Sequence, residues 1–113
     1  MSNGLWVKEL PGEIMVCDSS GIVLAMNNHA DELFAGDGGR DLLGTNVLDC
    51  HPDPAFGKLK GMLEDQSANC YFNTENGEKR LFFQAPWYLG GRYSGYVEIS
   101  FAVPENIPHF IRE

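Results

Sequence analysis

The spacing of apolar positions predicts strands at the start of the chain. EIMVCD and IVLAMN, residues 13–18 and 22–27, are two strand-like apolar runs separated by a short turn. Asp18 can hydrogen-bond back to its own turn, and Gly21 accepts the positive φ that a tight turn requires. These two runs therefore predict a β-hairpin.

The middle of the chain has helical spacing instead. NNHADELF, residues 27–34, opens with asparagines that can cap a helix, and its acidic residues follow in the first turn. Residues 40–52 are apolar but hold two turn signals, which favours short helical turns over one helix. Asp53 and Pro54 suit an N-cap and a first helical position, and the apolar stripe that follows predicts a helix closing by about residue 66.

The remainder of the chain, through residue 103, is rich in β-formers. An Asn-Gly pair at 76–77 and a Gly-Gly pair at 90–91 each lie between such runs, which predicts a three-stranded meander. In the last strand, residues 97, 99 and 101 share one face and residues 98 and 100 share the other. The pattern predicts an α+β domain: one antiparallel sheet with helices over one face.

The composition limits the classes of partner that the protein can bind. The chain has 113 residues, with 16 acidic and 8 basic side chains and a formal net charge of −8. This charge disfavours nucleic acid and anionic membrane surfaces, and no apolar run approaches the length of a membrane span. The three cysteines are widely spaced and odd in number, and the first residues do not resemble a secretory signal. We expect a cytoplasmic protein with reduced thiols.

Three segments in order resemble the PAS domain family. DSSGIVLAMNNHADELF, residues 18–34, is similar to its opening strand, turn, strand and Asn-led helix. LLGTN at 42–46 resembles the Gly-containing segment of its helical middle, and GYVEISF at 95–101 resembles its last strand. The resemblance implies a five-stranded antiparallel sheet in the order 2-1-5-4-3, with short helices over one face around a small cavity.

The resemblance covers nearly the whole chain, so we predict a single domain over residues 1–113. Its core would span about 11–103, with a lead-in at 1–10 and an irregular tail at 104–113. The family implies a sensory or interaction role, and we expect a signalling partner protein in another chain or a domain that works alone.

LDCHPDP, residues 48–54, is a candidate catalytic or metal-binding segment because Cys50 directly precedes His51. A catalytic thiol requires a base within hydrogen-bond reach, which adjacent residues rarely provide, and zinc requires about four ligands, typically in paired spacing. We interpret the segment mainly as a junction. Haem held by His51 is the less favoured alternative, because that histidine precedes the helix. The reactive-cysteine motif of the family's flavin-binding members is absent, so we do not expect flavin. We predict that no cofactor is required.

Other residues give no stronger case for catalysis. Ser19, Ser20 and His29 could suggest a hydrolase triad, but both serines belong to a turn and no Gly-x-Ser-x-Gly elbow is present. We predict that the protein is not an enzyme.

The family resemblance implies a cavity between the sheet and the helices. Asn46 and His51 are its candidate polar contacts, and a small apolar or aromatic metabolite is the expected ligand. The predicted lining residues are Val16, Leu24, Leu33, Phe34, Leu43, Asn46, Val47, Cys50, His51, Phe56, Leu59, Leu63 and Phe83.

Aromatic residues crowd the last two predicted strands, and one alternate set must face away from the helices. We expect this set to form a homodimer surface with the lead-in. The predicted interface residues are Leu5, Trp6, Leu10, Trp87 and Tyr96. The alternative to a ligand-binding sensor is a purely structural homodimerisation module whose core is filled by its own side chains.

Overall fold

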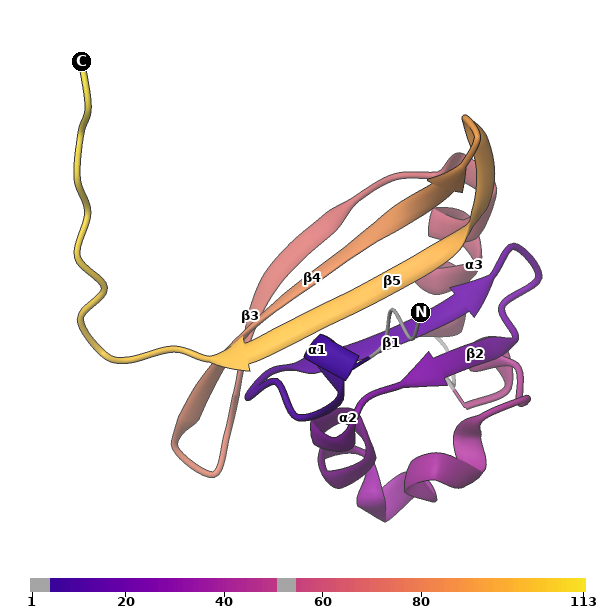
Figure 1. Cartoon of the computed structure of the whole chain (residues 1–113), viewed down its shortest axis with the longest axis horizontal. Helices are drawn as coiled ribbons and strands as arrows, with labels where there is room; N and C mark the ends of the chain where they lie inside the picture. The colour runs from indigo at the N-terminus through magenta and orange to yellow at the C-terminus, as the bar shows by residue number, and fades with distance from the viewer. Residues whose placement is uncertain (1–4, 51–54) are drawn as a thin grey trace.

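The computed structural model describes residues 5–50 and 55–113, without the side chains of residues 50, 55, 56 and 58. Its sheet has the predicted five antiparallel strands in the predicted order, β2-β1-β5-β4-β3 (Figure 1). The elements are α1 (Leu5–Lys8), β1 (Glu13–Asp18), β2 (Val23–Met26), α2 (Asn28–Leu33), η1 (Ala35–Asp37), η2 (Gly39–Leu42), η3 (Val47–Cys50), α3 (Ala55–Asp65), β3 (Asn69–Glu75), β4 (Glu78–Leu89) and β5 (Arg92–Ala102).

The hairpin turns explain the connections between strands. Both central residues of the β3–β4 turn have positive φ, 52° at Asn76 and 79° at Gly77, and the same holds at Gly90 and Gly91 between β4 and β5. This geometry matches the twist of antiparallel strands and favours Asn-Gly and Gly-Gly pairs. Between β1 and β2, Asp18 Oδ1 accepts hydrogen bonds from the backbone of residues 20 and 22. The predicted turn chemistry is therefore confirmed.

Two faces of the sheet differ in their side chains. On β1, Glu13, Met15 and Cys17 point to one side, which we call the inner face, and α3 covers it near Cys17. Ile14 and Val16 point to the other side, the outer face, where α1 lies across β1 (Figure 1).

Register places unexpected residues on the inner face. Ser100 lies opposite Glu13, and Glu98 lies opposite Met15 and Gln84. Residues directly opposite in an antiparallel pair share a face. The alternation predicted for β5 is confirmed, and its polar set is the one that turns inward.

A bulge fixes this register. The β4–β5 pairing starts at Leu89 with Arg92 and shifts by one residue between Trp87 and Tyr88. Gly95 lies at the shift with a φ of 141°, and a Cβ there would come within 1.9 Å of the Cys17 carbonyl oxygen. Only glycine allows β5 to approach β1 this closely.

The packed part of the core lies at one end of the inner face. Cys17, Met62 and Tyr96 form a buried cluster, with Val47 and Leu63 packed against it. The Tyr96 hydroxyl contacts the backbone carbonyl oxygens of Met62 and Ser67, 2.6 Å from the latter. Tyr96 thus ties the end of α3 to β5.

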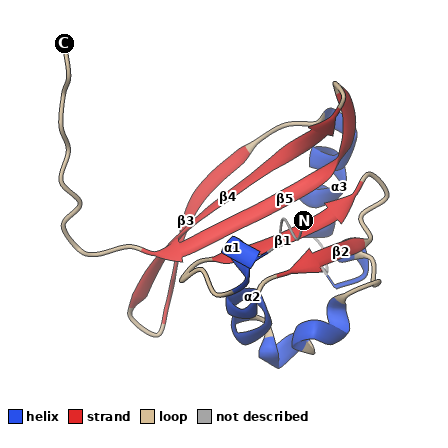
Figure 2. Ribbon diagram, viewed as in Figure 1, coloured by secondary structure: helices blue, strands red, loops and turns tan. Residues whose placement is uncertain are grey.

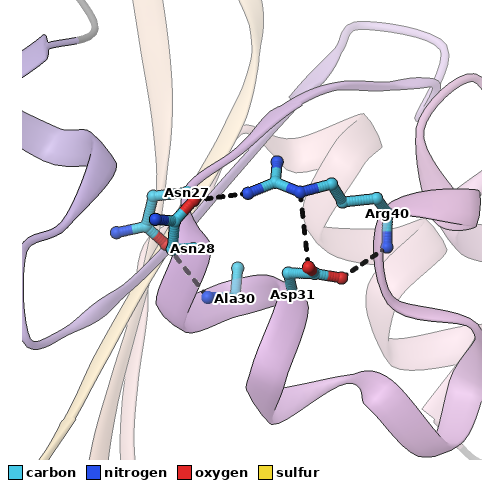
Figure 3. A network of polar contacts seen from close by, with 5 residues as sticks. All are labelled: Asn27, Asn28, Ala30, Asp31 and Arg40. Atoms are coloured by element: carbon cyan, nitrogen blue, oxygen red, sulfur yellow. Dashed lines mark hydrogen bonds and ion pairs between the residues drawn. The ribbon is translucent and has the colours of Figure 1, made fainter.

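Polar contacts hold the helical segment together. Asn27 caps α2, with its Oδ1 accepting the Ala30 backbone N–H at 3.0 Å, as the sequence predicted for an asparagine at this point. Asp31 accepts the backbone N–H of Arg40 at 2.8 Å and also pairs with its guanidinium at 3.3 Å, which joins α2 to η2 (Figure 3). These bonds fix the helical turns beside the sheet.

The chain after β5 has no regular secondary structure and leads away from the sheet (Figure 2). Ile107, Phe110 and Ile111 are exposed on it. Within the described residues, no helix combines the length and the apolar character that a membrane crossing requires.

Candidate ligand-binding site

A cavity of about 340 Å³ lies over the inner face of the sheet. Its lining comes from the sheet, from the helical turns after α2, and from α3. The apolar residues that line it are Met15, Cys17, Val23, Phe34, Leu42, Val47, Leu59, Met62, Phe82 and Val97, and the polar or aromatic hydroxyl-bearing ones are Asp37, Thr45, Tyr71, Asn73, Gln84, Tyr96 and Glu98.

Two polar side chains, Gln84 and Glu98, lie at the floor of this cavity, and Asn69 extends their line across the sheet. Gln84 Nε2 donates a hydrogen bond to Glu98 Oε2 at 2.7 Å. Asn69 Nδ2 donates to Gln84 Oε1 at 3.3 Å. The three residues face one another across β3, β4 and β5, so strand register positions them.

A second polar line runs beside the first and is more deeply buried. Ser100 Oγ donates to Glu13 Oε1 at 2.6 Å and accepts from Arg80 Nη1 at 3.3 Å. Glu13 and Ser100 have no exposed surface. Arg80 Nη2 also lies 2.8 Å from His29 Nε2, and since a guanidinium only donates, that ring nitrogen accepts.

Burial changes the protonation of Glu13. Removal from water raises its pKa to about 9, and the charge of Glu98 adds to this, while the Ser100 hydrogen bond and the Arg80 charge oppose it. Glu13 is therefore an uncharged carboxylic acid at neutral pH. Its Oε2 is buried, and a side-chain hydrogen bond between Glu13 and Glu98 further raises this pKa.

Aromatic rings form one wall. Tyr71 and Phe82 lie opposite each other on β3 and β4 and stack with ring centroids 5.2 Å apart and planes 5° apart. Both rings line the cavity. An apolar wall beside a short polar floor is the usual character of a small-molecule pocket.

Cys17, which lines the cavity, is a poor candidate for covalent chemistry. Burial raises the pKa of the Cys17 thiol, which disfavours the reactive thiolate. Among the side chains that the structure describes, no three acidic, histidine or cysteine groups come together as a metal site.

The chain resembles known proteins in its structure. The sequence matches no family profile and no curated protein to a significant degree. Solved structures do match. The PAS domain of BvgS from Bordetella pertussis is 18% identical with a TM-score of 0.68, over 89% of this chain and 83% of that one. The chain folds as a PAS-like domain.

Two further structures share the PAS-like fold at low identity. A C-terminal domain from Streptococcus mutans is 21% identical with a TM-score of 0.72, covering 88% of this chain and 81% of that one. The Aer2 receptor from Vibrio cholerae, described as a dual PAS-heme oxygen sensor, is 13% identical with a TM-score of 0.62, covering 82% and 95%.

Three of the predicted lining residues meet at the cavity of the PAS-like domain: Phe34, Val47 and Leu59. Leu63 lies beside it, packed against the buried cluster around Met62. The predicted ligand contact Asn46 is occupied elsewhere, because its Nδ2 donates to the Ser20 carbonyl oxygen and its Oδ1 accepts from the Leu48 N–H.

Five other predicted lining residues lie away from the cavity. Val16 alternates with Met15 and so belongs to the outer face, as does Phe83, which is opposite Ile99. Leu24, Leu33 and Leu43 are exposed. For the strand residues the reason is parity: a one-residue difference in register exchanges the two faces of a strand.

Three predicted lining residues fall outside what the structure describes. His51 and the side chains of Cys50 and Phe56 belong to this group. Binding of haem through His51 therefore stays a prediction.

Some of the predicted interface residues are exposed and others are not. Leu5 and Trp6 are 72% and 71% exposed on α1, and Leu10 is exposed as well. Tyr96 is a correction: it faces inward opposite Cys17 and is 6% exposed, so it is unavailable to a partner. Trp87 is half-buried, and its Nε1 donates to the Cys17 carbonyl oxygen at 3.0 Å.

Sequence reasoning missed the polar floor. Alternation along the chain predicts that Glu98 and Ser100 share a face of β5, but the predicted cavity lining takes only apolar residues from the strands. The signal was present in the turn at 76–77, whose two-residue loop pairs Asn69 with Gln84 directly. The pairing of Gln84 with Glu98 depends on the bulge in β5, where Ser94 is skipped, and it has no such signal.

Replacing Glu13 with glutamine should stabilise the protein increasingly as pH rises. In the wild type the folded pKa of about 9 lies above the ordinary value of 4.5, so between these values the folded state holds a proton that the unfolded state releases. Wild-type stability therefore falls with pH in this window, by at most about 1.4 kcal/mol per pH unit, and the variant lacks this contribution.

Urea unfolding of both proteins at pH 5, 7 and 8.5 measures the difference. Glu32→Gln, which removes the same charge at an exposed position of α2, is the control, and its difference from the wild type should change less with pH because the position is not buried. A Glu13→Gln difference that does not change with pH would contradict the buried, protonated carboxyl.

Proposed function

We propose that this PAS-like domain is a non-catalytic sensory domain that binds a small organic ligand in the cavity over its inner face. The observation that carries the proposal is a cavity of about 340 Å³ with mainly apolar walls and the Gln84–Glu98 pair at its floor. Protein interiors otherwise pack with few voids larger than a water molecule. A space of this size with convergent polar groups suits a ligand.

The position of the cavity supports a signalling role. Its lining includes Leu59 and Met62 of α3, and the end of this helix is held to the sheet through Tyr96. A ligand that bears on these side chains would change the packing of α3 against β5. We place the output in a partner protein and the domain in the cytoplasm. The sensor proteins among the structural neighbours are consistent with this role.

Binding should be visible as stabilisation. A ligand at about one hundred times its dissociation constant adds roughly 2.7 kcal/mol to the free energy of unfolding. Thermal unfolding with a panel of small apolar and aromatic compounds should therefore find compounds that raise Tm. Val47→Trp, which places a large side chain at the cavity lining, should abolish the Tm shift.

Leu89→Trp is the matched control, since Leu89 is exposed at the end of β4 and does not line the cavity. It should keep the ligand-induced shift. Retention of the shift by Val47→Trp, or a panel that leaves Tm unchanged in the wild type, would count against ligand binding at this cavity.

Homodimerisation is the second candidate function, and the exposure of α1 favours it. Leu5 and Trp6 are large apolar side chains left in solvent. Beside them the outer face presents Ile14 and Val16, which border a groove with Leu5. Exposed apolar surface of this extent often marks an interface. We propose that α1 and the outer face pair two copies of the chain.

Light scattering after size-exclusion chromatography tests the dimer. The wild type should have twice the mass of one chain, and Trp6→Glu should have the mass of one chain because a charge would be buried at the interface. Leu89→Glu, an equally exposed position distant in sequence, should leave the dimer intact. An unchanged Trp6→Glu dimer would rule out this interface.

A further inference from the structure

We propose that the cavity selects a primary amine on a compact apolar or aromatic body, with the ammonium group held by Glu98 beside the Tyr71–Phe82 wall. This inference rests on the proposed function and specifies the class of ligand.

The charges at the cavity have one sign. Of the described side chains that line it, Asp37 and Glu98 are acidic and none is lysine, arginine or histidine. Asp37 is exposed at the end of η1, and Glu98 is half-buried on β5. A carboxylate ligand would meet like charge in a partly apolar site, whereas an ammonium group would meet opposite charge.

Arg80 does not neutralise the cavity as a ligand contact. Its guanidinium lies on the inner face but is committed to Ser100 Oγ and His29 Nε2. It is buried and is absent from the lining. The Arg80 cation therefore supports the buried Glu13–Ser100 pair and does not contact a ligand in the cavity.

Glu98 retains the capacity to bind a donor. An ionised carboxylate can accept about four hydrogen bonds, and Gln84 and the protonated Glu13 carboxyl supply two of them. The neighbouring Glu13 is uncharged at neutral pH because burial raises its pKa to about 9. The floor therefore presents one carboxylate, oriented by Gln84, toward the space above it.

The aromatic wall suits the same ligand. Tyr71 and Phe82 occupy the same-face row next to Asn69, Gln84 and Glu98. An ammonium group near an aromatic face gains attraction from the ring quadrupole, about 0.5–2 kcal/mol. The rings also offer an apolar surface to the body of the ligand. A cavity of about 340 Å³ is near the lower end for ligand pockets, which favours a single ring with a short amine chain.

A set of three probes that share a phenylethyl group tests the charge selectivity: 2-phenylethylamine, 2-phenylethanol and 3-phenylpropanoate. Calorimetric titration at pH 7 should show the amine binding about tenfold tighter than the alcohol, since a desolvated ion pair adds to the shared ring contacts, and no binding of the propanoate. Glu98→Gln should bring the amine affinity close to that of the alcohol while leaving the alcohol affinity unchanged.

Two matched variants locate the effect. Asp41→Asn removes the same charge from η2 outside the cavity lining and should keep the amine preference. Asp37→Asn should reduce it less than Glu98→Gln does, because Asp37 is exposed. Retention of the Glu98→Gln protein's fold is checked by its alcohol affinity and its Tm.

The outcomes separate the inference from the proposed function. Equal affinities for amine and alcohol would overturn amine selection and leave ligand binding in place. Loss of the preference in Asp37→Asn but not in Glu98→Gln would overturn the assignment to Glu98. Failure of all three probes would overturn this ligand class, while the wider panel with Val47→Trp decides whether the cavity binds ligands at all.

Discussion

The buried carboxyl of Glu13 is the constraint on which the inner face depends. It lies without exposed surface against Ser100, which accepts in turn from Arg80. Burying an ionised carboxylate costs several kcal/mol, and protonation together with the Ser100 hydrogen bond reduces this cost. These bonds require β1, β4 and β5 to keep one register, and that register places Gln84 and Glu98 at the floor of the cavity. The position of the candidate site follows from this polar row.

The polar inner face has a consequence for the outer one. With Glu13, Glu98 and Ser100 turned inward, the apolar residues between them, such as Ile14 and Val16, turn outward. Asn27 connects the two sides, because its Nδ2 donates to carbonyl oxygens of Val7 and Gly12 near α1 while its Oδ1 caps α2. Asn27 thus joins α1, the segment before β1 and α2 through one buried side chain.

The elements of the fold could be predicted because their signals are local. Glycine and asparagine at the turns determine the hairpins, and an asparagine at residue 27 begins α2 as its capping chemistry indicates. The lining of the cavity could not be predicted as well, because it depends on register. Without a bulge, the turn at 90–91 would pair Gln84 with Val97, and the shift between Trp87 and Tyr88 pairs it with Glu98 instead. The expectation that apolar strand residues face the helices favours Val16 and Phe83, whereas Met15 and Phe82 line the cavity.

Carboxyl-detected NMR of the glutamate side chains from pH 3 to 10 tests the central claim most directly, since it follows the protonation of Glu13 in the folded protein. The account predicts that the Glu13 carboxyl stays protonated through neutral pH and titrates near its raised pKa of about 9. A Glu13 carboxyl that titrates near the ordinary value of 4.5 would contradict the buried polar row and the register built on it.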